Sequence, residues 1–268
     1  MTKFDEATQA IRVDEHTYDV CLDPGYAIGG PLNGGYLMAV ILRAAVDASP
    51  FEHPVSTTAQ FHKAPVAGPA QVVVEPLKAG RTVAFARARL VQDGVTQIES
   101  LITTATLQDV EPIYADEPAF EMPPVEECAK LPDPKPESGM TLNAQMELRF
   151  DPPTIGWLHG RPSGRPESRA YFRMAEPQDP DPYVLALAVD VLPPVIFSSG
   201  SRGWAPTVDL TWHLRALPAP RLAHPARQRP AGRRRLVRRG GRGTRLHRPP
   251  GRPVAPARPR RKRLKVGL

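Results

Sequence analysis

The sequence predicts an α+β fold in which antiparallel sheets curve around buried helices, and three observations point to it. One stretch in the first half is apolar on nearly every side, as expected for a helix that other elements enclose. Four strand-like stretches follow it, joined by short turns of the kind that connect antiparallel neighbours. The order of strand, helix and strand then recurs in the second half, which predicts two related units.

The first unit is expected within residues 1–108. A strand is predicted at residues 16–21, and a turn-rich segment then leads into a helix at residues 35–48, which is apolar apart from Arg43 and Asp47. Alternating side chains and intervening turns predict four further strands, at residues 55–63, 70–77, 82–92 and 96–107.

A proline- and acid-rich stretch separates the two units. Residues 109–140 contain seven prolines and nine acids, a composition typical of an exposed linker. The second unit is expected at residues 141–220, with a helix at 181–192 whose start is marked by alternating Asp and Pro residues from 179 to 182. Its strands are predicted at residues 145–150, 169–174 and 207–214.

The charge of the chain is distributed very unevenly. The 268 residues carry a formal charge of +7, yet residues 1–220 hold 17 Lys and Arg against 28 acids, a net −11. Residues 221–268 hold 18 Lys and Arg, no acid and no aromatic residue, a net +18. Such a segment lacks the side chains that build a packed core, so we expect a basic, disordered tail without strands.

Composition also excludes several classes of protein. The longest apolar run, residues 36–42, is far shorter than the about 20 residues that a membrane-spanning helix needs. The first residues show no secretion signal, so we expect a cytoplasmic protein. Cys21 and Cys128 stand alone and are interpreted as reduced structural thiols. No phosphate loop or metalloprotease motif is present, so neither a metal nor another cofactor is predicted.

Six segments together resemble a known family, the TesB-like (type II) acyl-CoA thioesterases, which have a double-hotdog fold. They are residues 33–45 (NGGYLMAVILRAA), 60–65 (QFHKAP), 77–82 (LKAGRT), 90–94 (LVQDG), 187–194 (LAVDVLPP) and 206–211 (PTVDLT). The resemblance covers about residues 15–217. It implies two antiparallel sheets that each wrap a long helix, with the second hotdog incomplete, and a homo-oligomeric enzyme that hydrolyses acyl-CoA to a free acid and CoA.

The resemblance also implies the residues of the site. In the resembled enzymes an Asp, a Ser or Thr and a Gln orient a water for attack on the thioester, and Asp190 and Thr207 match the first two. The Gln has no counterpart in the chain as written. Gly34 and Gly35 are expected to present backbone N–H groups to the substrate carbonyl at the helix start, and Arg81 is expected to contact the phosphates of CoA.

Each of these residues also has a plainer interpretation. Asp190 could be an exposed acid at a helix end, and Thr207 an ordinary β-branched strand residue. Gly34 and Gly35 could serve only the turn, and Arg81 could be a solvated residue of a hairpin. His62 and His213 could act as bases but are interpreted as structural or exposed side chains. Asp209, two residues along the strand, would share the face of Thr207 or be a solvated charge.

Two explanations compete for the basic tail. A nucleic-acid-binding tail would use its positive charges on phosphates, but no aromatic residue is present to stack on bases. The alternative is a frameshift near residues 219–221, because the codons of residues 245–258 permit an offset reading that resembles the family's closing strand. In that reading the missing Gln falls at the codons of Pro253 and Val254. We therefore predict a frameshift, which resequencing the gene across residues 218–222 decides.

Two functional alternatives remain open at the level of sequence. If the chain is expressed as written, the strand at residues 207–214 is left as an exposed edge, which favours aggregation. A catalytically inactive hotdog protein that binds acyl-CoA or assembles with partners is then the first alternative to the hydrolase. Nucleic-acid binding through the tail is the second.

Overall fold

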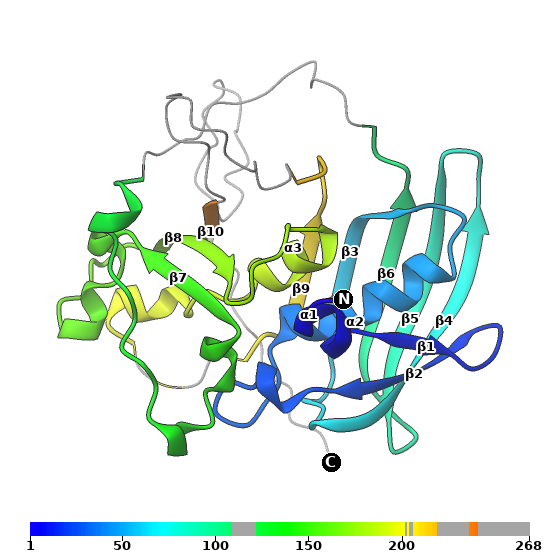
Figure 1. Ribbon diagram of the computed structural model, residues 1–268, viewed down its shortest axis with the longest axis horizontal. Helices are drawn as coiled ribbons and strands as arrows, with labels where there is room; N and C mark the ends of the chain where they lie inside the picture. The colour runs from blue at the N-terminus through cyan, green and yellow to red at the C-terminus, as the bar shows by residue number, and fades with distance from the viewer. Residues whose placement is uncertain (109–121, 202, 204–205, 219–235, 241–268) are drawn as a thin grey trace, which may run out of the picture.

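A computed structural model describes residues 1–108, 122–201, 203, 206–218 and 236–240. It contains a seven-stranded antiparallel sheet in the order β1-β2-β4-β5-β6-β3-β9 and a three-stranded sheet in the order β10-β8-β7. The two sheets lie on either side of the central helices α2 and α3 (Figure 1). The strands are β1 (Ala10–Arg12), β2 (Thr17–Leu22), β3 (His53–Phe61), β4 (Gly68–Ala79), β5 (Val83–Gln92), β6 (Val95–Ala105), β7 (Met146–Phe150), β8 (Glu167–Met174), β9 (Asp209–His213) and β10 (Leu236–Gly240). The helices are α1 (Lys3–Ala7), α2 (Gly34–Asp47) and α3 (Pro182–Ala188).

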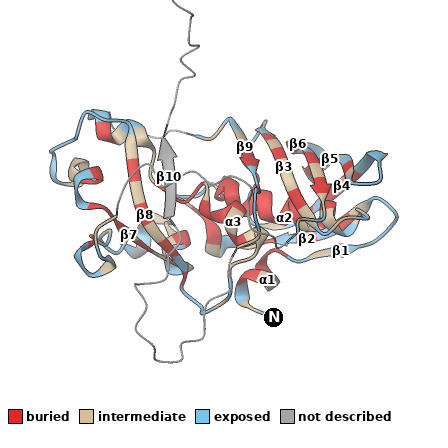
Figure 2. Cartoon of the chain, turned by 90° about the horizontal axis from the view of Figure 1, so that it is seen from above, coloured by how far each residue is buried: buried red, intermediate tan, exposed pale blue. Residues whose placement is uncertain are grey.

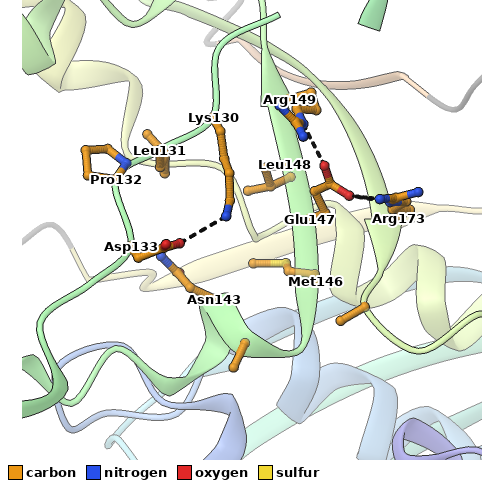
Figure 3. A pocket seen from close by; sticks show the side chains of 12 residues that line it. Lys130, Leu131, Pro132, Asp133, Asn143, Met146, Glu147, Leu148, Arg149 and Arg173 are labelled. Atoms are coloured by element: carbon orange, nitrogen blue, oxygen red, sulfur yellow. Dashed lines mark hydrogen bonds and ion pairs between the residues drawn. The ribbon is translucent and has the colours of Figure 1, made fainter. Parts of the chain in front are cut away.

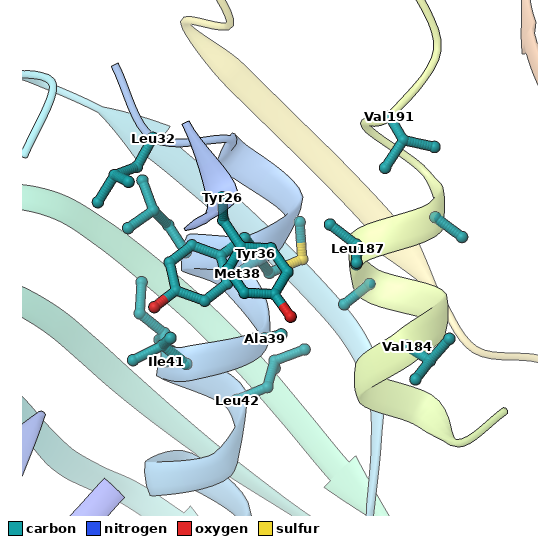
Figure 4. Close-up of a cluster of buried hydrophobic side chains, with 14 of the residues drawn as sticks. Tyr26, Leu32, Tyr36, Met38, Ala39, Ile41, Leu42, Val184, Leu187 and Val191 are labelled. Atoms are coloured by element: carbon teal, nitrogen blue, oxygen red, sulfur yellow. The ribbon is translucent and has the colours of Figure 1, made fainter. Parts of the chain in front are cut away.

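Helix α2 is the centre of the fold, and its all-round apolar sequence explains its place. Every residue from Gly34 to Leu42 is buried, because the large sheet covers one side of the helix and α3 packs on another. Buried residues, red in Figure 2, concentrate in α2, α3 and the strands that face them. The rings of Tyr26 and Tyr36 stack at the start of the helix, with centroids 4.3 Å apart and planes 8° from parallel (Figure 4). The predicted α+β class, with helices held against curved antiparallel sheets, is confirmed.

The predicted strands of the first unit appear in the predicted order, with each end within two residues of its prediction. The turn between β5 and β6 has the backbone conformation that its Asp-Gly sequence predicts. Asp93 and Gly94 have positive φ angles of 52° and 74°, the conformation that a two-residue hairpin of this sequence favours. Helix α1 and strand β1 were not predicted, because five- and three-residue elements are too short for a periodic signal.

Strand β9 joins the two halves of the molecule into one sheet. It pairs antiparallel with β3, and the register runs from Ser56 opposite His213 to Gln60 opposite Asp209. β9 is the last strand in the order of the large sheet, which agrees with the predicted edge position. Residues 207–218 are therefore held mainly by the first half of the chain, which the sequence pattern did not indicate.

Two predictions for the middle of the chain differ from the structure. The helix predicted at residues 181–192 is only the seven residues of α3, which closes with a bond from the Asp190 N–H to the Leu187 oxygen three residues back. Pro193 and Pro194 lack the N–H groups that would extend the helix further. The predicted exposed linker is also packed in part. Cys128 is buried, and Ala129 exchanges two backbone hydrogen bonds with Phe150 at the end of β7, 2.9 and 2.8 Å long. Residues 109–121 of that linker lie outside the described residues.

The prediction that the basic tail contributes no strand is wrong for residues 236–240. This segment forms β10, which pairs antiparallel with β8 from Leu236 opposite Tyr171 to Gly240 opposite Glu167. A ladder is made by backbone groups, so a segment without acids or aromatic residues can still add a strand to a sheet. The rest of the tail, residues 219–235 and 241–268, lies outside the described residues, and the frameshift stays a prediction.

Arg43 ties α1, α2 and α3 together. Its guanidinium donates to Thr8 Oγ1 at 2.7 Å and to Asp5 Oδ1 at 2.6 Å, lies 3.9 Å from the Asp181 carboxylate and stacks 4.2 Å from the centre of the Tyr183 ring. The side chain is 22% exposed, so water screens these contacts only partly.

We expect Arg43→Met to lower the free energy of unfolding by about 1–3 kcal/mol, because it leaves two carboxylates without their charged donor. Burial raises the pKa of Asp5, but hydrogen bonds from Thr2 and Arg43 outweigh it and leave that pKa below its usual value. The loss is therefore expected at neutral pH and shrinks as the pH falls through the range in which aspartates protonate. Urea unfolding at pH 7 and pH 4 measures both effects. Arg12→Met, which removes a more exposed ion pair with Asp47, is the control and should cost less than about 1 kcal/mol; equal losses would contradict the assignment.

Candidate active site

Asp190 lies where the end of α3 meets the start of α2. The helix ends at its cap residue Val189, and the next residue, Asp190, is only 6% exposed. Its Oδ2 accepts from the backbone N–H of Gly35 at 3.3 Å, and both Oδ2 and its backbone oxygen face the Asn33 amide. A carboxylate from the second half thus occupies the N-terminal end of the first-half helix, where the helix dipole favours negative charge.

Thr207 completes the pair that the resemblance implied. It is half-buried just before β9, and its hydroxyl donates to Asp190 Oδ1 at 3.4 Å. Because β9 is paired with β3, the first-half sheet holds the segment that carries Thr207. The structure therefore brings Asp190 and Thr207 together. Such long contacts are common before substrate binds and tighten in the reacting complex.

The two glycines at the start of α2 allow close approach rather than special backbone angles. A Cβ on Gly34 would lie 2.8 Å from Asp190 Oδ2 and 3.1 Å from the Phe61 ring. A Cβ on Gly35 would lie 2.6 and 2.7 Å from the backbone oxygens of Ala186 and Leu187 in α3. Gly34 thus leaves room for the carboxylate, and Gly35 leaves room for the neighbouring helix.

The N–H groups of these glycines differ in what they face. We expected both to face a substrate carbonyl, but the Gly35 N–H points to the Asp190 carboxylate. Among the residues that the structure describes, the Gly34 N–H has no hydrogen-bond partner. As the first residue of α2, Gly34 has no partner within the helix either, so its N–H is available to an incoming oxygen.

Arg81 lies apart from this site, in the exposed turn between β4 and β5. That turn lies near the C-terminal end of α2. It is close to Ala84, which pairs with Thr104 of β6, and the Thr104 hydroxyl is 2.6 Å from the hydroxyl of Ser49, just beyond the end of the helix. Asp190 is at the other end of that helix, whose 14 residues span about 21 Å. The structure does not bring Arg81 together with Asp190 and Thr207.

The remaining polar residues near the site fit their plainer interpretation. His62, His213 and Asp209 are all exposed. Tyr36, in the first turn of α2, donates its hydroxyl to the Ala7 backbone oxygen at 2.8 Å. Burial raises the pKa of Tyr36 above its usual range, so the phenol stays neutral near pH 7. Asp190 is therefore the side chain at this helix end that can act as a base.

A separate pocket of about 420 Å³ lies beside β7 (Figure 3). Its charged side chains are all paired and leave one positive charge in excess: Lys130 pairs with Asp133, and Glu147 pairs with both Arg149 and Arg173. Burial raises the pKa of Glu147, but the two arginines outweigh it and leave that pKa lowered. Neither Asp190 nor Thr207 lines this pocket, and sequence reasoning did not indicate it.

The described part of the chain contains neither a metal-binding cluster nor a helix that could span a membrane. No group of three or more His, Cys, Asp and Glu side chains is placed to hold a metal ion there. No helix in the same residues is long and apolar enough to cross a membrane.

Comparison with protein families identifies the chain. Residues 22–108 match the N-terminal domain of acyl-CoA thioesterases, and residues 125–240 match the C-terminal domain of the same enzymes. The chain belongs to the acyl-CoA thioesterase family. The second match begins inside the predicted linker and ends inside the predicted tail, at the last residue of β10.

Individual relatives of this thioesterase-family chain agree. A Thermobifida fusca structure, assigned provisionally as a thioesterase II, is 41% identical, covers 82% of this chain and 84% of its own, and has a TM-score of 0.75. An uncharacterised Mycobacterium tuberculosis protein is 29% identical over 74% of this chain and 75% of its own length. The thioesterase-like protein TwmA of Talaromyces wortmannii is 42% identical over 34% of this chain and 27% of its own.

More distant structures establish the fold. A protein of Alicyclobacillus acidocaldarius described with a hotdog fold is 19% identical, covers 81% of this chain and 80% of its own, and has a TM-score of 0.68. The predicted resemblance to hotdog thioesterases is therefore confirmed. The comparisons support the hydrolase and give no support to the inactive or nucleic-acid-binding alternatives.

Proposed function

We propose that this chain hydrolyses acyl-CoA to a free acid and CoA by attack of a water held between Asp190 and Thr207. The observation that carries the proposal is the buried Asp190 carboxylate, placed at the N-terminal end of α2 and within 3.4 Å of the Thr207 hydroxyl. Membership of the acyl-CoA thioesterase family supports the choice of a thioester substrate.

The reaction needs a base, a positioning hydroxyl and a donor for the oxyanion. Asp190 accepts a proton from the water as its oxygen bonds to the thioester carbon, and Thr207 fixes the position of that water. The carbonyl oxygen becomes an oxyanion, which the Gly34 N–H and the dipole of α2 stabilise. The C–S bond then breaks, the acid leaves, and the CoA thiolate takes the proton from Asp190.

The family's Gln is the component that this chain does not supply in the described residues. Its predicted counterpart, in the offset reading of Pro253 and Val254, lies in a part of the chain that the structure does not describe. We propose that Asp190 and Thr207 support hydrolysis without it, at a rate that restoring the reading frame would raise.

A thiol-release assay on acyl-CoAs of increasing chain length tests the function. We expect release by the wild type, a fall in kcat of about tenfold in Thr207→Val, and recovery of most activity in Thr207→Ser. Valine keeps the shape of threonine and removes only the hydroxyl. No release from any acyl-CoA would refute the function, and full activity of the valine variant would refute the role of Thr207.

Self-association and location are separate proposals. We propose a homo-oligomer, as the resemblance implies, and a cytoplasmic location, because the longest apolar run, residues 36–42, is far too short to span a membrane. Light scattering of the purified chain and fractionation of the cells that make it are the measurements that decide these two points.

A further inference from the structure

We propose that Asn33 is a positioning residue for the reaction, which fixes the Asp190 carboxylate so that its Oδ1 faces Thr207 and the water. The inference rests on the proposed hydrolase function. It concerns a residue that was noted only as part of the resembling segment, 157 positions away from Asp190 in the sequence.

Both ends of the Asn33 side-chain amide are engaged. The residue is 2% exposed, and its Oδ1 accepts from the backbone N–H of Tyr36 at 2.9 Å, which caps α2. Its Nδ2 donates to the Asp190 backbone oxygen at 2.9 Å and also lies 3.4 Å from Asp190 Oδ2. The amide cannot turn away from Asp190 without giving up the helix cap.

The backbone of Asn33 is held as firmly as its side chain. Its N–H donates to the Tyr26 backbone oxygen at 2.9 Å, and its own oxygen accepts from Leu37 at 3.1 Å. Asp190 lies two residues beyond the end of α3, and its backbone N–H donates to the Leu187 oxygen of that helix at 3.1 Å. This bond holds the backbone of Asp190 but does not orient its carboxylate. Asn33 therefore supplies a fixed reference for a carboxylate that the second half presents.

The two oxygens of the Asp190 carboxylate face different groups. Oδ2 faces the start of α2, where the Gly35 N–H and the Asn33 amide both lie within 3.4 Å. Oδ1 faces the Thr207 hydroxyl. Asn33 and Gly35 thus hold Oδ2 at the start of the helix, with Oδ1 turned toward Thr207, where the proposed mechanism holds the water.

Helix capping alone does not require asparagine at this position. Ser and Asp cap helices about as well as Asn, because each offers a side-chain oxygen to the free N–H groups. Serine offers a single hydroxyl in place of the amide, so it can keep the cap but cannot also donate to both Asp190 oxygens that the Asn33 Nδ2 faces. Aspartate would set a second carboxylate beside Asp190, so serine is the informative substitution. Capping and positioning can therefore be separated by substitution.

The test compares Asn33→Ser with Asn143→Ser, a change at the only other asparagine in the chain. We expect the Asn33 variant to lower kcat about ten- to hundredfold with KM within about twofold, while the midpoint of thermal unfolding stays near that of the wild type. Loss of a donor makes a carboxylate bind a proton more readily, so the acid limb of the kcat profile should move to higher pH. The Asn143 variant should match the wild type in all of these measurements.

A second readout does not depend on activity. The Asp190 carboxyl signal, assigned by its absence in Asp190→Asn, is followed by carbon NMR through a pH titration of the wild type and of Asn33→Ser. A higher midpoint in the serine variant supports the proposal. An unchanged midpoint, or unchanged kcat and pH profile in an active enzyme, overturns it. Absence of thiol release by the wild type refutes the hydrolase function instead, and the titration still decides the role of Asn33.

Discussion

Replacing Asp190 by asparagine is expected to lower kcat for acyl-CoA hydrolysis by about 10²- to 10⁴-fold, the usual contribution of a positioned general base. An amide can still accept the Gly35 N–H, so the fold should survive, but it cannot take a proton from water. The thiol-release assay gives kcat and KM separately. We expect the loss to appear in kcat, because the carboxylate acts on the water rather than on substrate affinity.

Asp209→Asn is the matched control for this substitution. Asp209 lies two residues after Thr207, is exposed, and stands opposite Gln60 at the end of the β3–β9 ladder. Its removal changes the net charge by the same amount near the same segment and should leave kcat unchanged. If Asp190→Asn were as active as this control, Asp190 would not be the base.

Gly35→Ala is expected to destabilise the protein by about 1–3 kcal/mol, although alanine is the better helix former. The added methyl would enter the backbone of α3, at 2.6 Å from the oxygen of Ala186, and backbone atoms can yield only if α2 and α3 move apart. Urea unfolding measures the loss. Activity should fall as well, since Asp190 is carried at the end of the displaced helix.

Gly34→Ala is expected to disturb the proposed site without disturbing the packing of α2 against α3. Its methyl would meet only side-chain atoms, those of Asp190 and Phe61, which can rotate. We therefore expect near-normal stability with a strongly reduced kcat, the opposite balance to Gly35→Ala. Equal losses of stability in the two variants would mean that the close contact between α2 and α3 is not what requires glycine at residue 35.

The sequence predicts well whatever depends on neighbours along the chain. An apolar run without a polar face predicted the buried helix α2, and Asp93-Gly94 predicted the tight turn between β5 and β6. Asp190 and Thr207 were found only through the resemblance, because one Asp and one Thr are common residues with no local signature of catalysis. The structure brings that pair together, as the resemblance implied.

Contacts between distant segments could not be predicted in this way. The pairing of β9 with β3 depends on how the two halves pack, and an alternating pattern does not indicate which strand will pair with which. Asn33 is a residue type that commonly caps helix N-termini, yet its hydrogen bond to Asp190 joins residues far apart in sequence. Arg81 matched a family segment, but the topology places it at the opposite end of α2.

The contacts of Arg43 bear on how many reaction centres one chain can carry. The helices α2 and α3 run antiparallel, so each begins beside the end of the other. A carboxylate stands at each start: Asp190 at the start of α2, and Asp181 at the start of α3, where it caps the helix and lies 3.9 Å from the Arg43 guanidinium. The described residues thus commit the second carboxylate to the cap and to Arg43, and we expect the proposed hydrolase to have one reaction centre per chain rather than two.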